Sequence, residues 1–342
     1  MNKWLVVLAI SSILFVGGCA NSASPISPAF NTNSVQSPQS KRPLILVSNY
    51  SVSGISPEID AYDISANGDA SPIIRLGASS RVAVATGLAF DSLGRLFACC
   101  GVNGVNVYAP DLSNGAQPIA VIGCPSDVFS GSGLALSPSG DVYLSEMPDA
   151  PGLGIQWVES GATGCVNVHT IGGPHTDLNT PQELAVDSKG QVYAADGAAD
   201  FGQPGVSVYA PEVEGDAVPL RFITGPHTGF FHGTLWGVAL NNNGLIYVLS
   251  GDYSDPGAFL SVFNADACGD VAPLRVQKLV GVSYPSSIAV DKQNLLYVTD
   301  YSNAINVYDG NAVSNTSLEP LRTIRGPHTG LNSPVFITLR DT

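Results

Sequence analysis

The chain has 342 residues, of which 44% are hydrophobic and only 12% are charged, and its formal net charge is −14. Such an acidic chain repels nucleic acid and anionic lipid, so the composition excludes a DNA- or RNA-binding protein and attachment to a membrane through a basic patch. The 37 glycines and 24 prolines suit a fold made of many turns, and helical periodicity is almost absent after residue 20.

Residues 1–19 read as a bacterial secretion signal. Lys3 gives the positive start, and the apolar run from Trp4 to Val16 is too short to span a bilayer. The run ends in Val-Gly-Gly-Cys19, which resembles the lipobox of bacterial lipoproteins. The resemblance implies that Cys19 is acylated and becomes the new N-terminus; the alternative is an ordinary signal peptide with a chance cysteine. Ala20, in place of Asp, implies sorting to the outer membrane or cell surface.

Residues 20–42 form the second segment and are rich in Ser, Asn, Pro and Gln. This composition cannot bury a core, so we expect a flexible tether. An anchor, a tether and a folded head together predict a protein of the bacterial cell envelope that contacts the membrane only through its lipid.

Residues 43–342 repeat one unit of four short apolar runs, which we name strands a to d. The copy at residues 285–330 is the clearest, with runs at Ser287–Val290, Leu295–Thr299, Ile305–Tyr308 and Leu321–Ile324. The third run always ends in an aromatic residue: Tyr62, Tyr108, Trp157, Tyr209, Phe263 and Tyr308. The first run carries a small residue: Ala89, Ala135, Ala185, Ala239, Ala289 and Thr338. The repeat length is about 50 residues, which is typical of four-stranded propeller blades.

The first and last units are both incomplete. Leu44–Ser48, Ile59–Ile64 and Ile73–Leu76 match strands b, c and d, and nothing before Pro43 could be strand a. Pro334–Leu339 matches strand a and has no strand b after it. The sequence therefore predicts an all-β, six-bladed β-propeller of four-stranded blades, closed by the C-terminal strand completing the first blade.

The repeat resembles bacterial NHL-type repeats. The similarity is closest at residues 286–300, 305–337 and 206–229, where the strings I-N-V-Y, G-P-H-T-G and S-I-A-V-D stand. It covers residues 43–342 and implies a six-bladed propeller. It implies little about function, because such propellers include hydrolases, lyases and binding modules.

Polar residues stand at the end of strand b in most units. The column consists of Asn49, Cys100, Glu146, Asp196, Ser250 and Asp300. Its three acids and one amide, Asn49, Glu146, Asp196 and Asp300, are candidates to bind a ligand or a divalent cation such as calcium at one mouth of the ring. Six-bladed lactone hydrolases resemble this arrangement, but no further motif of that family is present. The alternative is that each residue caps a turn of its own blade.

The string GPHT occurs three times and places His175, His227 and His328 in the connections between strands d and a. Equivalent points on neighbouring blades are at least about 10 Å apart, while zinc needs ligand nitrogens about 2 Å from the ion. We therefore interpret GPHT as a turn rather than a metal site.

Five cysteines follow Cys19, and export makes disulfides possible. Cys100 and Cys124 are the predicted pair, on the mouth side of the second blade. Cys165 and Cys268 are placed in c-to-d loops of the third and fifth blades, far apart on the opposite side. The alternative is that all five are buried small apolar residues. An odd count leaves at least one thiol free unless two chains pair.

The sequence favours a lipid-anchored, exported binding or interaction module without catalytic residues. Its partner would be a protein, a glycan or a small molecule. The second hypothesis is a divalent-cation-dependent hydrolase of the lactonase-like propeller type, using the same mouth.

Overall fold

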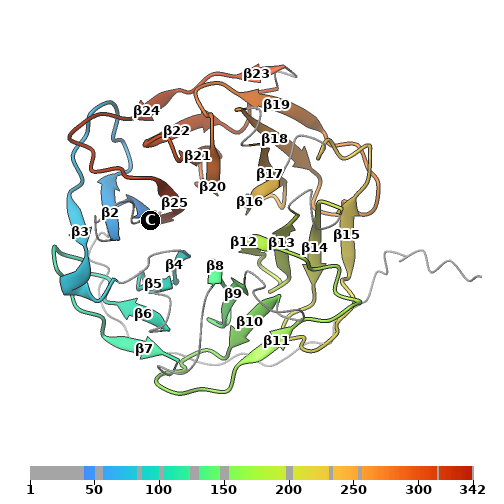
Figure 1. Cartoon of the computed structure of the whole chain (residues 1–342), viewed down its shortest axis with the longest axis horizontal. Helices are drawn as coiled ribbons and strands as arrows, with labels where there is room; N and C mark the ends of the chain where they lie inside the picture. The colour runs from blue at the N-terminus through green and yellow to red at the C-terminus, as the bar shows by residue number, and fades with distance from the viewer. Residues whose placement is uncertain are drawn as a thin grey trace, which may run out of the picture.

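The computed structural model describes residues 42–50, 57–82, 87–99, 104–123, 131–146, 154–197, 203–230, 234–252, 256–313 and 316–340. These residues form six antiparallel sheets arranged as a ring, a β-propeller (Figure 1). The predicted fold class is confirmed. No helix in these ranges is long and apolar enough to cross a membrane.

Each blade runs from an innermost strand a to an outermost strand d. Blade 1 consists of β25 (Pro334–Arg340), β1 (Leu44–Asn49), β2 (Glu58–Asp63) and β3 (Ile74–Leu76). Blade 2 consists of β4 (Leu88–Phe90), β5 (Leu96–Cys99), β6 (Val105–Tyr108) and β7 (Ala120–Ile122), and a single 3-10 turn, η1 (Ala78–Ser80), precedes it. Blade 3 consists of β8 (Gly131–Leu136), β9 (Val142–Glu146), β10 (Ile155–Val158) and β11 (His169–Ile171).

The second half of the chain repeats the arrangement. Blade 4 consists of β12 (Pro181–Val186), β13 (Val192–Asp196), β14 (Gly205–Tyr209) and β15 (Arg221–Thr224). Blade 5 consists of β16 (Thr234–Leu240), β17 (Ile246–Gly251), β18 (Ala258–Phe263) and β19 (Arg275–Leu279), and it gains a short parallel strand, β23 (Ser317–Leu318). Blade 6 consists of β20 (Pro285–Val290), β21 (Leu295–Asp300), β22 (Ala304–Asp309) and β24 (Arg322–Ile324).

The ring closes as the incomplete end units predict. The last strand, β25, pairs antiparallel with β1, so that Leu46 lies opposite Thr338. The C-terminal strand thus supplies the innermost strand of the first blade (Figure 1). Closure leaves strand b of blade 1 paired on both sides, which removes an exposed inner edge.

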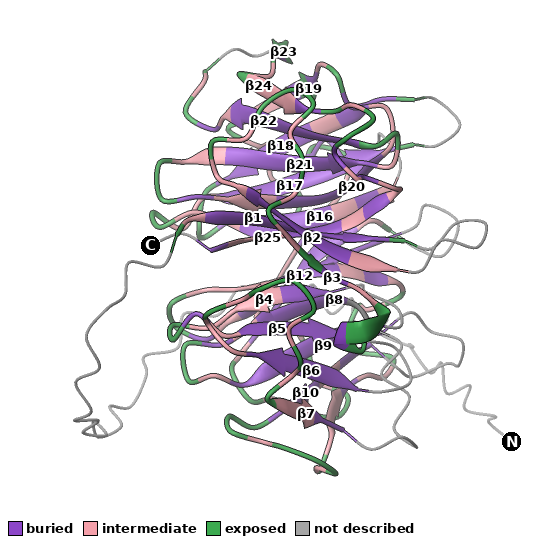
Figure 2. Cartoon of the chain, turned by 90° about the vertical axis from the view of Figure 1, so that its left-hand side faces the viewer, coloured by how far each residue is buried: buried purple, intermediate pink, exposed green. Residues whose placement is uncertain are grey.

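The core lies between blades rather than within one sheet. Strands b and c are buried along almost their whole length, whereas the outer strands d are only partly buried (Figure 2). In one cluster, Ile45 and Val47 of blade 1 pack with Ile305 and Val307 of blade 6. A blade buries both faces because it has a neighbour on each side, so its b and c strands read as continuous apolar runs.

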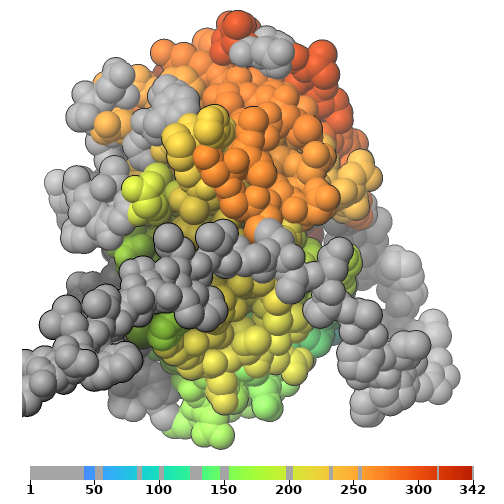
Figure 3. Space-filling model, turned by 90° about the vertical axis from the view of Figure 1, so that its right-hand side faces the viewer, coloured from blue at the N-terminus to red at the C-terminus, as the bar shows by residue number. Residues whose placement is uncertain are grey.

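Arginine side chains join blade 4 to blade 5 and blade 6 to blade 1 at the outer rim. Blades 4 and 5 lie directly against one another (Figure 3). Arg221 of β15 donates to the carbonyl oxygens of Ala265 and Ala267 in blade 5. Arg322 of β24 does the same to Ile64 and Ala66 in blade 1. The arginine that follows the proline-rich start of strand d is therefore a repeated link between blades.

Candidate functional site

The b strands all end on one side of the ring, where the connections from strand d to the next strand a also run. We call this side the mouth face. Because every blade is an antiparallel meander, the last residues of β1, β9, β13 and β21 share this face. They are the four predicted ligand-binding residues: Asn49, Glu146, Asp196 and Asp300. All four side chains are buried, none being more than 3% exposed.

Asp196 and Asp300 bind the backbone of their own connection. The two oxygens of Asp196 accept hydrogen bonds from the N–H groups of Asn179 and Thr180, each at 2.6 Å. Asp300 accepts from Ser283 at 2.9 Å and Tyr284 at 3.3 Å, and also from Ser302 at 2.8 Å. Each carboxylate therefore caps the chain segment that leads into its own innermost strand.

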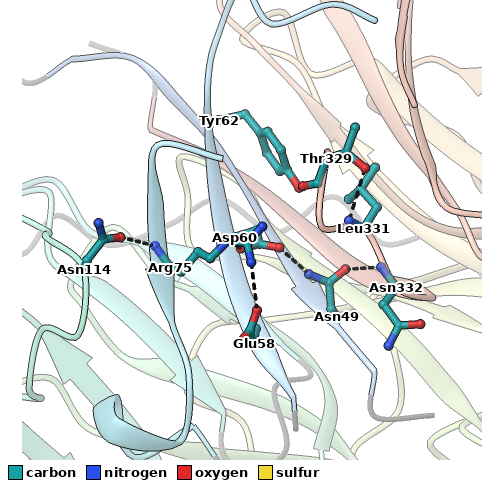
Figure 4. A network of polar contacts seen from close by, with 9 residues as sticks. All are labelled: Asn49, Glu58, Asp60, Tyr62, Arg75, Asn114, Thr329, Leu331 and Asn332. Carbon is teal, nitrogen blue, oxygen red and sulfur yellow. Dashed lines mark hydrogen bonds and ion pairs between the residues drawn. The ribbon is translucent and has the colours of Figure 1, made fainter. Parts of the chain in front are cut away.

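Asn49 does the same for blade 1, within a larger network (Figure 4). Its Oδ1 accepts from the N–H of Asn332 at 3.0 Å, and its Nδ2 donates to Asp60 Oδ2 at 2.9 Å. The guanidinium of Arg75 lies near Asp60, with 3.4 Å between Nε and Oδ1, an ion-pair distance without a hydrogen bond. Burial raises the pKa of Asp60 to about 7 although Arg75 lowers it. Asn49 thus belongs to the junction that closes the ring.

Glu146 differs from the other three. Its backbone N–H donates to Gly154 at 2.9 Å, but neither carboxyl oxygen has a hydrogen-bond partner among the described residues, and the residue is 1% exposed. Burial alone raises the pKa of this carboxyl to about 7. The matching connection in blade 3, residues 124–130, lies outside the described part of the chain. Most buried polar groups in proteins are hydrogen-bonded, so an orphaned carboxyl at a shared face is a candidate functional group.

The four residues do not form one cluster. Burial raises the pKa of Asp196 to about 6, and the only carboxylate that contributes is Asp177. No charged group contributes to the raised pKa of Glu146. Across the described ranges, no three His, Cys, Asp or Glu side chains lie close enough together to hold a metal ion. The structure therefore brings these residues to one face without gathering their carboxylates around one point.

The GPHT histidines form a repeated turn at the rim. His227 donates its backbone N–H to Asp270 Oδ1 at 2.7 Å, and its Nδ1 lies 2.6 Å from Oδ2 of the same aspartate. His175 pairs in the same way with Asp216, and His328 pairs with Asp69. Each histidine thus binds the c-to-d loop of the next blade.

Two cysteines contradict the alternative that all are small apolar residues. Cys165 and Cys268 are each disulfide-bonded, and Cys165 is exposed. Cys99 is a fully buried thiol at the end of β5. The predicted pair, Cys100 and Cys124, lies outside the described residues, as does Cys19, so both predictions remain predictions.

Glu183, near the propeller axis, was missed by the sequence reasoning. The position two residues before the small residue of each strand a is occupied by Gly87, Gly133, Glu183, Gly237, Ser287 and Phe336. Glu183 is only 7% exposed, and burial raises its pKa to about 8. A charged residue in a column otherwise made of three glycines, a serine and a phenylalanine was the signal that could have revealed it.

Comparison with known proteins supports the fold and leaves the function open. No protein-family model and no curated protein matches the chain. A gluconolactonase from Xanthomonas campestris is similar, with 15% identity, a TM-score of 0.51, and coverage of 84% of this chain and 87% of that one.

A protein of unknown function from Bacteroides caccae has 12% identity and a TM-score of 0.53, covering 87% of this chain and 98% of the other. The hydrazine synthase of Kuenenia stuttgartiensis has 14% identity and a TM-score of 0.49, with 75% and 71% covered. At these identities the likeness is one of fold: the chain is a six-bladed β-propeller.

Proposed function

We propose that the chain is an exported, lipid-anchored propeller of the NHL type that acts as a binding module, and that its ligand contacts the mouth face beside Glu146. The resemblance of its repeats and the Val-Gly-Gly-Cys19 string support the NHL-type head and the anchor. The single observation that carries the binding site is the carboxyl of Glu146, which is buried and has no hydrogen-bond partner within the described ranges.

A group in that state is costly for the protein. Burying a carboxyl without a hydrogen bond costs roughly 1–3 kcal/mol by mutational measures, and an ionised one costs more. A ligand that donates hydrogen bonds to Glu146 would recover this free energy on binding. Ligand binding at this position would therefore stabilise the fold, which gives the proposal a simple readout.

The lactonase-like alternative has less support. A divalent cation needs several oxygen ligands around one point, yet Asp196 and Asp300 use their oxygens to cap backbone N–H groups. The gluconolactonase among the similar structures shares the fold at 15% identity, and fold alone does not carry the activity. A binding role for the mouth face fits the side-chain contacts better.

The test is thermal melting of the purified head with a panel of glycans, amino compounds and calcium chloride, together with an assay of gluconolactone hydrolysis. We expect at least one panel member to raise the melting temperature of the wild type and not that of Glu146→Gln. Asp300→Asn is the matched control, because its side chain caps a turn and should leave the ligand response intact. Lactone turnover that is lost in Glu146→Gln, or no stabilisation by any member, would reject the binding module.

The anchor has its own test. Cys19→Ser should move the protein from the membrane fraction to the soluble fraction of the envelope without changing the melting temperature of the head. Membrane fractionation that is unchanged in the variant would contradict lipidation, and it would leave the ligand proposal unaffected.

A further inference from the structure

The carboxyl of Glu183 links three blades near the propeller axis. The side chain starts on β12 of blade 4, and a hydrogen bond joins its Oε1 to Ser287 Oγ on β20 of blade 6. Its Oε2 accepts the N–H of Ile288 at 3.3 Å, and the carboxyl also has a backbone hydrogen bond with Val238 of blade 5. The side chain therefore contacts the inner strands of blades 5 and 6 together.

The inner strands are shaped to admit this carboxyl. A Cβ on Gly237 would lie 2.3 Å from Glu183 Oε2 and 2.8 Å from Ile288 Cγ2, so a larger residue at that point of β16 would displace the carboxyl. Gly133 of β8 lies against the backbone of β12, where a Cβ would lie 2.6 Å from the carbonyl oxygen of Gln182 and 3.0 Å from Glu183 Cα. The missing side chain at Gly237 leaves room for the long side chain of Glu183, which reaches blade 6.

The contact continues from blade 6 to blade 1. Ser287 Oγ also accepts the N–H of Ile337, at 3.3 Å, on the C-terminal strand β25. A chain of hydrogen bonds thus runs from Glu183 through Ser287 to the strand that closes the ring. We call Glu183, Val238, Ser287 and Ile288 the axial clamp.

In the part of the chain that the structure describes, no charged side chain compensates Glu183. The strands packed around it, β8, β16 and β20, carry no titratable residue, and the acids that end β9 and β13, Glu146 and Asp196, make no contribution to its protonation. Arg340 lies at the opposite end of β25 and makes none either. Only burial and the hydrogen bonds from Ser287, Ile288 and Val238 act on the carboxyl. Ionisation therefore leaves an unneutralised charge in the hub.

We propose that Glu183 is a proton-dependent clamp, in which the neutral acid holds blades 4, 5 and 6 together near the axis and loss of its proton loosens them. In the structure Ser287 Oγ–H donates to Oε1 and the N–H of Ile288 donates to Oε2. In the neutral form the carboxyl proton lies on Oε1, the Ser287 hydroxyl turns, and Oε1–H donates to Ser287 Oγ. The connection on the mouth face leads into β12 at Pro181, two residues before Glu183. A looser clamp therefore also loosens that connection.

The sign of the pH dependence follows from the pKa of Glu183, which burial raises. The pKa of Glu183 rises from an ordinary value of about 4.5 to about 8, so the closed state holds a proton that an opened hub releases. The stabilisation is complete below about pH 4.5 and is lost as the pH rises to about 8. The equilibrium constant for opening should then rise about tenfold per pH unit in that window and level off above it.

The first experiment follows the carboxyl directly in the folded, full-length head. In protein labelled with ¹³C-glutamate, one carboxyl signal should titrate with a midpoint near pH 8 and should be absent in Glu183→Gln. Glutamine has the same shape, keeps one acceptor oxygen and is neutral at every pH. A signal that disappears in Glu183→Gln but titrates below about pH 6 would overturn the proposal.

The second experiment measures hydrogen exchange of the Val238 and Ile288 amides, corrected for the intrinsic pH dependence of exchange. Their protection should fall about tenfold per pH unit between about pH 5 and pH 8 in the wild type, and much less in Glu183→Gln. Glu146→Gln is the matched control, because it removes another buried carboxyl and should keep the dependence. Equal slopes in the wild type and in Glu183→Gln would overturn the clamp. If Glu183→Gln does not fold, the wild-type carboxyl titration, assigned through its coupling to these amides, still decides.

Discussion

Glu146 and Asp196 stand at the same position of neighbouring blades and have opposite surroundings. Asp196 ends β13 and binds two backbone N–H groups of the connection that enters blade 4. Glu146 ends β9, and its carboxyl binds no N–H group of the residues that the structure describes. Both are 1% exposed. The repeat thus places an acid at both positions, and the contacts of each carboxyl decide whether it is a cap or a candidate for binding a ligand.

The difference is also visible in the protonation of the two groups. Burial raises the pKa of both, to about 6 in Asp196 and to about 7 in Glu146. In Asp196 the hydrogen bonds from Thr180 and Asn179 work against burial, whereas in Glu146 nothing does. A cap therefore retains part of its ionised character, and an orphaned carboxyl loses it. This contrast can be tested by removing each contact in turn.

The largest effect should come from removing a whole connection with its inner strand. In blade 1 the capped segment belongs to the C-terminus, because Asn49 binds Asn332 and β25 pairs with β1. Ending the chain at Gly330 removes both and exposes the edge of β1. We expect the truncated protein to aggregate or to lose most of its stability, which for a domain is roughly 5–15 kcal/mol. Size-exclusion chromatography and thermal melting measure this; a monomeric product as stable as the full chain would contradict the closure.

A smaller effect should follow from removing one cap. Asp196→Ala leaves the N–H groups of Asn179 and Thr180 without their acceptor, which destabilises the fold. It also removes the cost of burying the Asp196 carboxyl, which offsets part of that loss. We expect a net loss of about 1–3 kcal/mol in the free energy of unfolding, measured by denaturant titration. Ser250→Ala in blade 5 is the matched control, since the hydroxyl of Ser250 has no hydrogen-bond partner among the residues described. Equal losses in the two variants would show that the cap contributes nothing.

Substitution of Glu146 is expected to raise the free energy of unfolding at high pH rather than lower it. Its pKa is raised, so the wild type is stabilised below about pH 4.5 and loses this stability as the pH rises to about 7. Glu146→Gln lacks this loss, and should match the wild type near pH 4 and exceed it by about 1–3 kcal/mol near pH 8 in the absence of ligand. Denaturant titrations at the two pH values measure the difference. A variant less stable than the wild type at pH 8 would mean that Glu146 has a partner in the folded state.

Most of the fold could be predicted because the repeat forces it. The predicted Leu295–Thr299 is observed as β21, Leu295–Asp300, and the predicted Pro334–Leu339 is observed as β25, Pro334–Arg340. Alternating turns and apolar runs fix strand length, and the two incomplete end units fix the closure. The fifth strand of blade 5, β23, was not predicted. It arises from the insertion before β24, which pairs in parallel with β19.

The site was less predictable, because the same residue type serves different purposes at equivalent positions. Asn49, Asp196 and Asp300 are caps, which the sequence analysis kept as an alternative, and only the contacts separate them from Glu146. Glu183 was invisible for another reason: its importance depends on the absence of a side chain at Gly237, a residue of another blade. Spacing along the chain carries no information about such a contact across the axis.

The smallest effect is expected at the rim, where an acid is also paired but exposed. His175 Nδ1 lies 2.5 Å from Asp216 Oδ2, and both side chains are largely in solvent. The hydrogen bond to Asp216 raises the pKa of His175 above its ordinary value of 6.5. The pair therefore stabilises the fold at low pH, and this contribution is lost as the pH rises through the raised value. Exposed pairs are also screened by salt. His175→Ala should lower the melting temperature slightly near pH 5, and by less than Asp196→Ala does. Near pH 8, or in high salt, it should leave the melting temperature unchanged. A loss at pH 5 as large as that of Asp196→Ala would mean that the rim turns, rather than the buried caps, hold the blades in register.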